Sequence, residues 1–113
     1  MSSTVLTKSA RIADLNDEFR KTGIGGKTVM TRAVADLPAE VISSAIATVR
    51  TFNDFTKDND PHREHDFFSF EVAGVKFFWK CDYYDKKMEF GSEDPSDSAK
   101  TTRVATLMLA SDY

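Results

Sequence analysis

A stretch of alternating aromatic and polar residues between Glu64 and Asp85 constrains the fold more than any other part of the chain. The segment reads EHDFFSFEVAGVKFFWKCDYYD and holds eight of the thirteen aromatic residues, which are nine Phe, three Tyr and one Trp in total. Alternation with a period of two residues is typical of β-strands that bury one face. The pattern therefore predicts a β-hairpin here.

The register of this hairpin follows if Ala73-Gly74 forms a two-residue turn. One face then holds only apolar pairs, which are Val72 with Val75, Phe70 with Phe77 and Phe68 with Trp79. The other face pairs Glu71 with Lys76, Ser69 with Phe78 and Phe67 with Lys80. A shift of one residue would mix the two faces, so pattern and charge pairing together favour this register.

A second turn, at Asp85-Lys86, predicts a third strand that extends the hairpin into a meander. It would place Tyr83 opposite Met88, Cys81 opposite Phe90 and Asp82 opposite Glu89. The last pair brings two like charges together, which is unfavourable between neighbouring strands.

Hydrophobic periodicity predicts a helix over residues 9–21, with Ser9 as its N-cap and Gly23 as its stop signal. The segment KTVMTRAV, residues 27–34, is rich in β-branched residues and predicts a strand. Residues 1–8 precede the first predicted element, and we expect them to be a disordered terminus.

A capping acid followed by proline, at residues 36–38, predicts the start of a second helix that ends near Phe52. The polar segment 55–66 is long for a loop in a small domain. Residues 101–110, TTRVATLMLA, fit either a helix or a strand, and the apolar spacing favours a helix that starts near Ser98 or Thr101.

The predicted order is α-β-α-β-β-β-α, which gives a single α+β domain over residues 9–113 with helices packed on a mainly antiparallel sheet. The length of 113 residues suits one domain. Cys81 is the only cysteine, and the chain shows neither a signal-peptide pattern nor an apolar run of membrane-spanning length. These features favour a cytoplasmic protein.

Charge is distributed unevenly along the chain. Residues 54–97 hold twelve acidic and six basic side chains, a net charge of −6, whereas the rest holds six acidic and nine basic side chains, a net charge of +3. Solvated loop carboxylates explain part of this asymmetry. The alternative is an acidic surface that attracts a basic partner.

Motifs for bound phosphate or calcium are incomplete. GIGGKT, residues 23–28, lacks the first glycine of a phosphate-binding loop, because Lys21 stands in its place. Asp58, Asp60 and His62 alternate like calcium ligands, but the required glycine and closing acid are missing. We therefore expect no cofactor.

His62, His65 and Asp66 are the weak candidates for a metal site, since they are close in sequence and carry ligand atoms. Together with Asp82 and Glu89 they would form the site of a small metal-dependent or acid–base enzyme, which is one alternative function. Cys81 falls on the apolar face of the hairpin and is expected to be inert. The sequence supports a binding role better than a catalytic one, so no residue is predicted to be catalytic.

Three aromatic residues, Phe67, Phe78 and Tyr84, are not needed for the predicted core. With the neighbouring carboxylates they predict a surface for a protein partner that is itself basic, such as a nucleic-acid-binding complex, with no direct nucleic-acid or membrane binding. A homodimer is the other alternative. The predicted partner-binding residues are Asp58, Asp60, Glu64, Asp66, Phe67, Phe78, Asp82, Tyr84, Asp85 and Glu89.

Four runs of the chain carry a family resemblance: LNDEFRKTGIGG, TRAVADLP, the stretch from FNDFTKDNDPHREHDFF to GSEDPSD, and TTRVATLMLASDY. With these runs the chain, from about Ile12 onward, resembles a family of short bacterial proteins of unknown function, DUF3768. The resemblance implies no reaction, cofactor or catalytic residue. It implies a bacterial cytoplasmic protein often carried on mobile DNA elements, with a role in the contest between mobile DNA and host defence. Together with the net charge of −6 over residues 54–97 and the surplus aromatic residues, the resemblance predicts an inhibitor of a host defence system, of the anti-CRISPR or anti-restriction type, whose carboxylates mimic nucleic acid.

Overall fold

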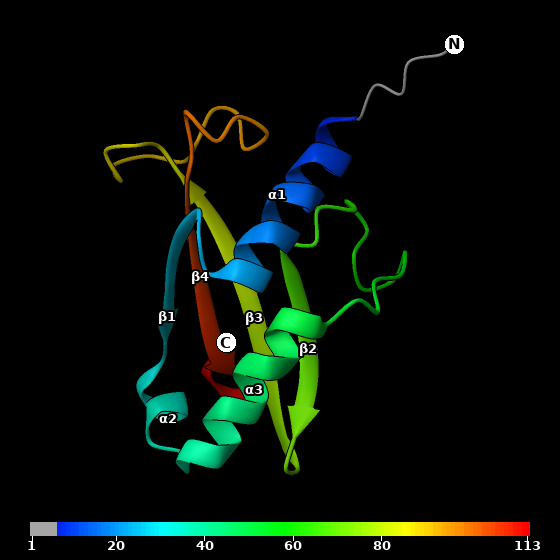
Figure 1. The fold of residues 1–113 in the computed structure, drawn as a ribbon, viewed down its shortest axis with the longest axis vertical. Helices are drawn as coiled ribbons and strands as arrows, with labels where there is room; N and C mark the ends of the chain where they lie inside the picture. Colours follow the sequence, from blue (N-terminus) through cyan, green and yellow to red (C-terminus); the bar gives the residue numbers. More distant parts are fainter. Residues whose placement is uncertain (1–6) are drawn as a thin grey trace.

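A four-stranded mixed sheet with two helices packed on one of its faces forms the structure, a computed structural model that describes residues 7–113 (Figure 1). The strand order is β1-β4-β3-β2, with β1 parallel to β4 and the other neighbours antiparallel. The predicted α+β class is confirmed. In chain order the elements are α1 (Lys8–Thr22), β1 (Gly26–Met30), α2 (Arg32–Ala35), α3 (Ala39–Thr51), β2 (Phe67–Val72), β3 (Val75–Tyr84), β4 (Thr102–Leu109) and the 3-10 turn η1 (Ala110–Asp112).

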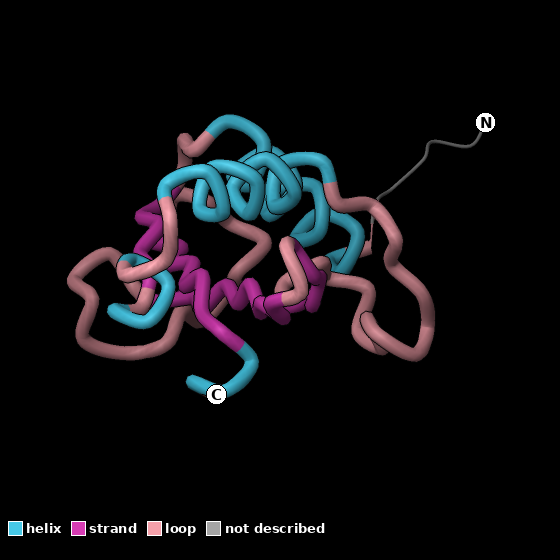
Figure 2. Tube along the Cα trace, turned by 90° about the horizontal axis from the view of Figure 1, so that it is seen from below, coloured by secondary structure: helices cyan, strands magenta, loops and turns pink. Residues whose placement is uncertain are grey.

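The hydrophobic core lies between the sheet and the pair α1 and α3, which sit together on one face (Figure 2). The sheet contributes Phe68, Phe77 and Trp79, each no more than 1 % exposed. Phe19 of α1 and Val49 of α3 pack onto them. Large buried aromatic side chains supply much of the free energy of folding in a domain of this size.

The hairpin of β2 and β3 has the register that the sequence predicts, and all six pairs are confirmed. Its turn residues Ala73 and Gly74 both have positive φ angles, 53° and 77°. Two consecutive positive φ angles are the geometry of a type I′ turn, whose twist matches that of the strands. Ala73 adopts this conformation although it carries a Cβ atom.

The predicted third strand after Asp85-Lys86 is wrong. The chain turns tightly there, because the Asp85 carboxylate accepts the Glu89 N–H at 3.0 Å, and it leaves the sheet after one bridge between Tyr84 and Gly91. Phe90 is 72 % exposed rather than paired with Cys81. The partners of Cys81, Asp82 and Tyr83 are instead Ala105, Val104 and Arg103 of β4.

Residues 102–109 form the strand β4, so the favoured helix over 101–110 is also wrong. Arg103, Ala105 and Leu107 are buried on the helix-covered face, while the β-branched Thr102, Val104 and Thr106 lie on the other face. β4 occupies an interior position between β1 and β3. Pairing on both sides satisfies its backbone as a strand, and this overrides the weak helical spacing of its apolar residues.

The first helix starts earlier than predicted, since Thr7 is the N-cap of α1 in place of Ser9. Gly23 ends this helix in a left-handed conformation, as predicted. The predicted disordered terminus, residues 1–8, lies outside the described residues except for Thr7 and Lys8. The predicted strand 27–34 is shorter, because Thr31 caps the short helix α2.

The second long helix, α3, follows Pro38 and ends at Thr51, in agreement with the prediction. None of the helices among residues 7–113 is long and apolar enough to cross a membrane.

Candidate functional site

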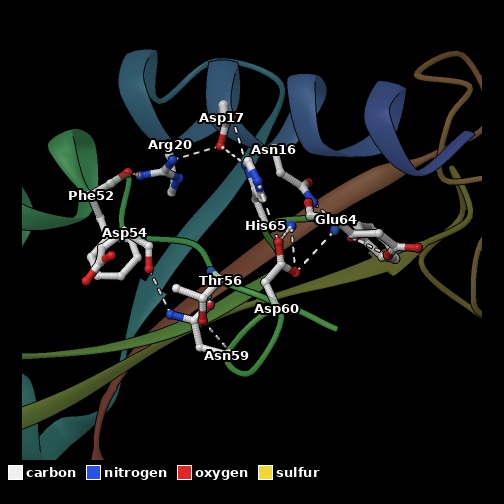
Figure 3. A network of polar contacts seen from close by, with 11 residues as sticks. Asn16, Asp17, Arg20, Phe52, Asp54, Thr56, Asn59, Asp60, Glu64 and His65 are labelled. Atoms are coloured by element: carbon white, nitrogen blue, oxygen red, sulfur yellow. Dashed lines mark hydrogen bonds and ion pairs between the residues drawn. The ribbon is translucent and has the colours of Figure 1, made fainter. Parts of the chain in front are cut away.

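Asn16 is the centre of a buried polar network beneath α1 (Figure 3). Its side-chain amide donates to the Glu64 carbonyl at 2.9 Å and to the Tyr83 hydroxyl at 2.8 Å. Its carbonyl oxygen accepts from Arg103 Nε at 2.7 Å and faces the Cys81 thiol at 3.7 Å. One side chain of α1 therefore joins the loop before β2 to both β3 and β4.

His65 lies between two carboxylates in the same network (Figure 3). Its Nδ1 is 3.0 Å from both oxygens of Asp17, and its Nε2 is 3.5 Å from Asp60 Oδ2. The imidazole stacks flat on Phe55, with 3.8 Å between ring centroids and 3° between planes. Asp60 is 5 % exposed and also accepts the backbone N–H groups of Glu64 and His65.

Asn59 organises the tip of the same loop. Its side chain accepts the Thr56 N–H at 2.7 Å and donates to the Asp54 carbonyl at 2.8 Å. The long polar segment is therefore folded onto itself by its own side chains, as expected for a compact surface loop.

Arg20 ties the network to α3. Its guanidinium donates to Asp17 at 2.7 Å and to the Val49 and Phe52 carbonyls at 2.6 and 2.9 Å. Only 1 % of the Arg20 side chain is exposed, and it lies over the ring of Phe55 at 5.4 Å. A buried cation beside Asp17 balances the carboxylate charge, which is the usual condition for burying an ionic group.

The weak metal candidates His62, His65 and Asp66 are not brought together as a ligand set. Within residues 7–113, His, Cys, Asp and Glu form no group of three or more that could hold a metal ion. Asp17 and Asp60 face different nitrogens of the His65 ring, so they do not converge on one point. Asp66 does lie across from Cys81, as the hairpin register predicts, because its carbonyl accepts the Cys81 N–H at 2.8 Å.

Burial shifts the ionisation of several groups here. Burial first, and then the charge of Asp66, raises the pKa of the Glu64 carboxyl above its usual value. Burial first, and then the charge of Asp60, raises the pKa of Asp66 in the same way. Burial raises the pKa of Cys81 to about 12 and also raises the pKa of Tyr83. Cys81 therefore stays a neutral thiol at neutral pH, which does not suit a nucleophile.

The second candidate site is the face of the sheet opposite α1 and α3. Phe67 and Phe78 are partly buried there, with 5.1 Å between ring centroids, and both rings contact Tyr113 at 5.8 and 5.5 Å. Asp112 positions Tyr113 by accepting from the Leu109 N–H at 3.0 Å. Figure 2 shows α1 and α3 together on one side of the sheet and the C-terminus on the other.

The ten predicted partner-binding residues lie in three different places. Phe67, Phe78, Asp82 and Tyr84 share the open face of the sheet, where Asp82 pairs with Lys80 at 3.4 Å. A second group belongs to the loop before β2 and its junction with the strand: Asp58, Asp60, Glu64 and Asp66. The third group is the turn after β3, which holds Asp85 and Glu89.

Four contributors were missed in the sequence: Asn16, Asp17, Arg20 and Tyr113. Asn16 carried a signal, because it follows Ile12 by four residues and so lies on the apolar stripe of its helix. A polar residue on that stripe must find hydrogen-bond partners inside the protein. Neither Asp17 nor Tyr113 differs in sequence pattern from an ordinary surface residue.

No curated protein and no solved structure shows a significant match to this chain. One family model matches residues 30–112, which is most of the chain and includes the loop before β2 and all of β2, β3 and β4. The matched segment begins after α1, which supplies Asn16, Asp17 and Arg20 to the polar network. The chain belongs to the family described as protein of unknown function (DUF3768).

Proposed function

We propose that this protein is a non-enzymatic binding module whose open sheet face engages a partner protein. The observation that carries the proposal is the cluster of Phe67, Phe78 and Tyr113 on a face that α1 and α3 leave uncovered. The strand register places the following residues on the open sheet face, where all but the buried Met108 are partly or fully exposed: Lys27, Val29, Phe67, Ser69, Glu71, Lys76, Phe78, Lys80, Asp82, Tyr84, Thr102, Val104, Thr106 and Met108.

The composition of this face suits recognition of a protein. Aromatic rings cluster on β2 and β3, where Lys76 lies 5.8 Å from the Phe78 ring and Lys80 pairs with Phe67. Interfaces concentrate their binding energy in central aromatic residues that a polar rim shields from water. Burial of this apolar area would contribute about 25 cal/mol for each Å² removed from water.

The carboxylates of the polar network, which an acid–base enzyme would need for catalysis, have structural roles here. Asp17 and Asp60 hold the His65 ring, and Asp60 also accepts two backbone N–H groups. Glu64 accepts from the Tyr83 hydroxyl at 3.3 Å. These contacts fasten the loop before β2 to itself, to α1 through Asp17 and to β3 through Tyr83, so they support a rigid scaffold for the sheet face.

The partner in this proposal has a basic surface, such as that of a nucleic-acid-binding complex. Residues 54–97 carry a net charge of −6. Within β2 and β3 the carboxylates on the open sheet face, Glu71 and Asp82, are balanced by Lys76 and Lys80, so the acidic surplus lies beside this face, in the loop before β2 and in the residues after β3. Opposite charge accelerates association and selects the partner. Inhibition of a host defence complex is the form of this function that the family resemblance suggests.

Variants of the open sheet face test the proposal. The chain is immobilised and exposed to lysate of the organism that encodes it, at low and high salt, and retained proteins are identified. Phe67→Thr and Phe78→Thr keep strand propensity but remove the rings. Ile24→Thr is the matched control, because Ile24 is 77 % exposed and lies before β1, away from this face.

We expect that wild type and Ile24→Thr retain a basic protein at low salt. Either Phe variant should weaken the affinity for this protein about tenfold, which corresponds to about 1.4 kcal/mol of binding free energy. Equal retention by all variants would exclude the open sheet face as the site. Retention that is indifferent to salt would exclude the electrostatic part. Phe67, Phe78 and the neighbouring lysines could instead stack the bases of a single-stranded nucleic acid. A labelled single-stranded oligonucleotide tests this alternative, and tight binding of the oligonucleotide would contradict a protein partner at this face.

A further inference from the structure

A groove beside strand β1 lies at the edge of the sheet, between β1, the end of α1 and α3. Its volume is about 300 Å³. Most of its lining is apolar and includes Phe19, Met30, Ile46, Val49, Trp79 and Leu107. We call this hollow the β1 groove, and it is separate from the open sheet face.

The backbone of β1 is open to further pairing on the side away from β4. The Thr31 N–H donates to the Leu107 carbonyl at 3.1 Å, so the alternation of a strand turns Val29 toward β4 and turns Thr28 and Met30 away from it. No strand among residues 7–113 pairs with that outer side (Figure 1). Thr28 and Met30 thus present unpaired backbone donors and acceptors next to the groove.

Apolar side chains flank this edge and remain in contact with solvent. Val29 is 47 % exposed, Met30 is 40 % exposed and Ile46 is 36 % exposed. An exposed strand edge with apolar neighbours tends to recruit another chain, and proteins usually protect such edges. Lys27 is the one charged residue within β1.

The charge that the β1 groove offers a ligand is positive. Arg20 and Arg50 line it and no acidic residue does, but Arg20 is buried and ion-paired with Asp17 at 2.7 Å, so Arg50 supplies the available charge. Arg50 is exposed, and within residues 7–113 no carboxylate forms an ion pair with it. Charge complementarity therefore favours an acidic occupant.

We propose that the β1 groove binds an extended acidic segment of a partner protein, which pairs with β1 as an additional strand. One apolar side chain of the segment fills the groove over Trp79, and a neighbouring carboxylate meets Arg50. In this mode backbone pairing supplies affinity, and a pocket for alternate side chains supplies specificity. The site differs in face and in charge from the one under Proposed function.

Two other occupants fit less well. A second copy on the same edge would place one groove that holds Arg50 and no acidic residue against another, so it would supply no opposite charge. A small molecule would use the groove but leave the backbone groups of Thr28 and Met30 unpaired, and about 300 Å³ is the lower end of the usual size of such sites.

Peptide selection followed by matched variants tests the proposal. A displayed library of random peptides is selected on the full chain, and the selected peptides are then titrated while the fluorescence of Trp79 is followed. Trp79 is the only tryptophan and lines the groove, so it reports on occupancy directly. We expect selected peptides with alternating apolar residues and at least one Asp or Glu.

Thr28→Pro removes an outward N–H of β1, a position at which an edge strand tolerates proline. Ser69→Pro is its matched control on the opposite edge. The bond from the Cys81 N–H to the Asp66 carbonyl sets the alternation of β2, which turns Ser69 away from β3. Circular dichroism establishes that both variants are folded, and Arg50→Glu is an independent variant at an exposed position.

We expect Thr28→Pro and Arg50→Glu each to weaken the selected peptides at least about tenfold, and Ser69→Pro to leave their affinity unchanged. If Thr28→Pro does not fold, the affinity of the selected peptides for Arg50→Glu alone tests the proposal. Peptides without acidic residues, unchanged affinity for Arg50→Glu, or a dimer of the free chain that Thr28→Pro dissociates would each overturn the proposal. Loss of peptide binding in Phe78→Thr would show that the peptide binds the open sheet face instead of the β1 groove.

Discussion

At the scale of single residues, close contacts with Arg103 limit which side chains positions 16 and 26 can accept. Asn16 is fully buried and makes contacts with three segments of the chain. Gly26 is a second such position, because a Cβ atom there would overlap the Arg103 carbonyl oxygen and would crowd the Arg103 Cβ atom at 2.9 Å. Both positions depend on Arg103 of β4, which the sequence alone does not place near α1 or β1.

Gly26→Ala is expected to destabilise the protein by about 2 kcal/mol, since added volume in a tight contact forces the backbone to move. β1 would have to move away from β4, because the nearest atoms belong to backbone. Urea unfolding followed by Trp79 fluorescence measures the effect. Gly91→Ala is the control, as its Cβ would lie 3.8 Å from the Tyr83 carbonyl oxygen, an ordinary contact, and should change stability little.

Asp66→Asn is expected to raise the melting temperature at pH 7. Burial and the charge of Asp60 raise the pKa of Asp66 in the folded state above its usual value of 3.8, so ionisation of this group opposes folding at neutral pH. As the pH falls through the folded pKa toward 3.8, the folded wild type takes up the proton first and gains stability. The advantage of the variant should therefore shrink with decreasing pH.

Thermal melts of wild type, Asp66→Asn and the exposed control Asp58→Asn, between pH 7 and pH 4, check this dependence. A constant difference between wild type and Asp66→Asn across this range would show that hydrogen bonding, rather than burial of charge, determines the effect.

At the scale of elements, local patterns were predictable and distant pairings were not. The hairpin of β2 and β3 was predicted to the residue, because its two strands are adjacent in sequence and its alternation permits only one register. The sequence favours a helix where the structure has β4, because the apolar residues of this segment fit both periods and its two neighbouring strands lie far away in sequence. The polar loop before β2 was predicted as an element, but its attachment to α1 was not.

His65→Ala is expected to loosen that loop without unfolding the domain. The substitution removes the stack on Phe55 and the contacts with Asp17 and Asp60. Hydrogen exchange of the backbone amides in residues 56–64 should become about tenfold faster, since local opening replaces a closed state held by few contacts.

Amides of α3 should keep their exchange rates in His65→Ala, because α3 packs on the sheet independently of the imidazole. His62→Ala is the matched control, as His62 is exposed in the same loop. If exchange in α3 accelerates equally, the loop is part of the cooperative core rather than a separately opening unit.

At the scale of the whole molecule, α1 links the segments that surround it. Arg11 donates to the Ser96 carbonyl at 2.8 Å, Asn16 reaches the loop before β2 as well as β3 and β4, and Arg20 reaches the end of α3. These partners are separated by many residues along the chain, so the helix does not form a separate unit. The open sheet face and the β1 groove are consequently surfaces of one cooperative body.

Unfolding is expected to be a single transition, in which helix content from circular dichroism and Trp79 fluorescence change together. Asn16→Ala should lower both transitions equally, by about 2 to 4 kcal/mol, because it leaves the buried Arg103 Nε without an acceptor and removes the donor to the Tyr83 hydroxyl and the Glu64 carbonyl. Asp14→Ala, exposed on the same helix, is the control. Separate transitions in Asn16→Ala would show that α1 unfolds independently.

The chain alone determined the α+β class, the hairpin register, and the division of its aromatic residues between two faces. Each of these depends on alternation or capping within a few residues, where sequence distance and spatial distance agree.

Only the tertiary structure decided that β4 inserts between β1 and β3, that Asn16 and His65 anchor the loop before β2, and that the predicted carboxylates lie in three places. These outcomes come from contacts between residues tens of positions apart. Their free energy depends on which buried donors and acceptors meet after packing, and no local pattern specifies that.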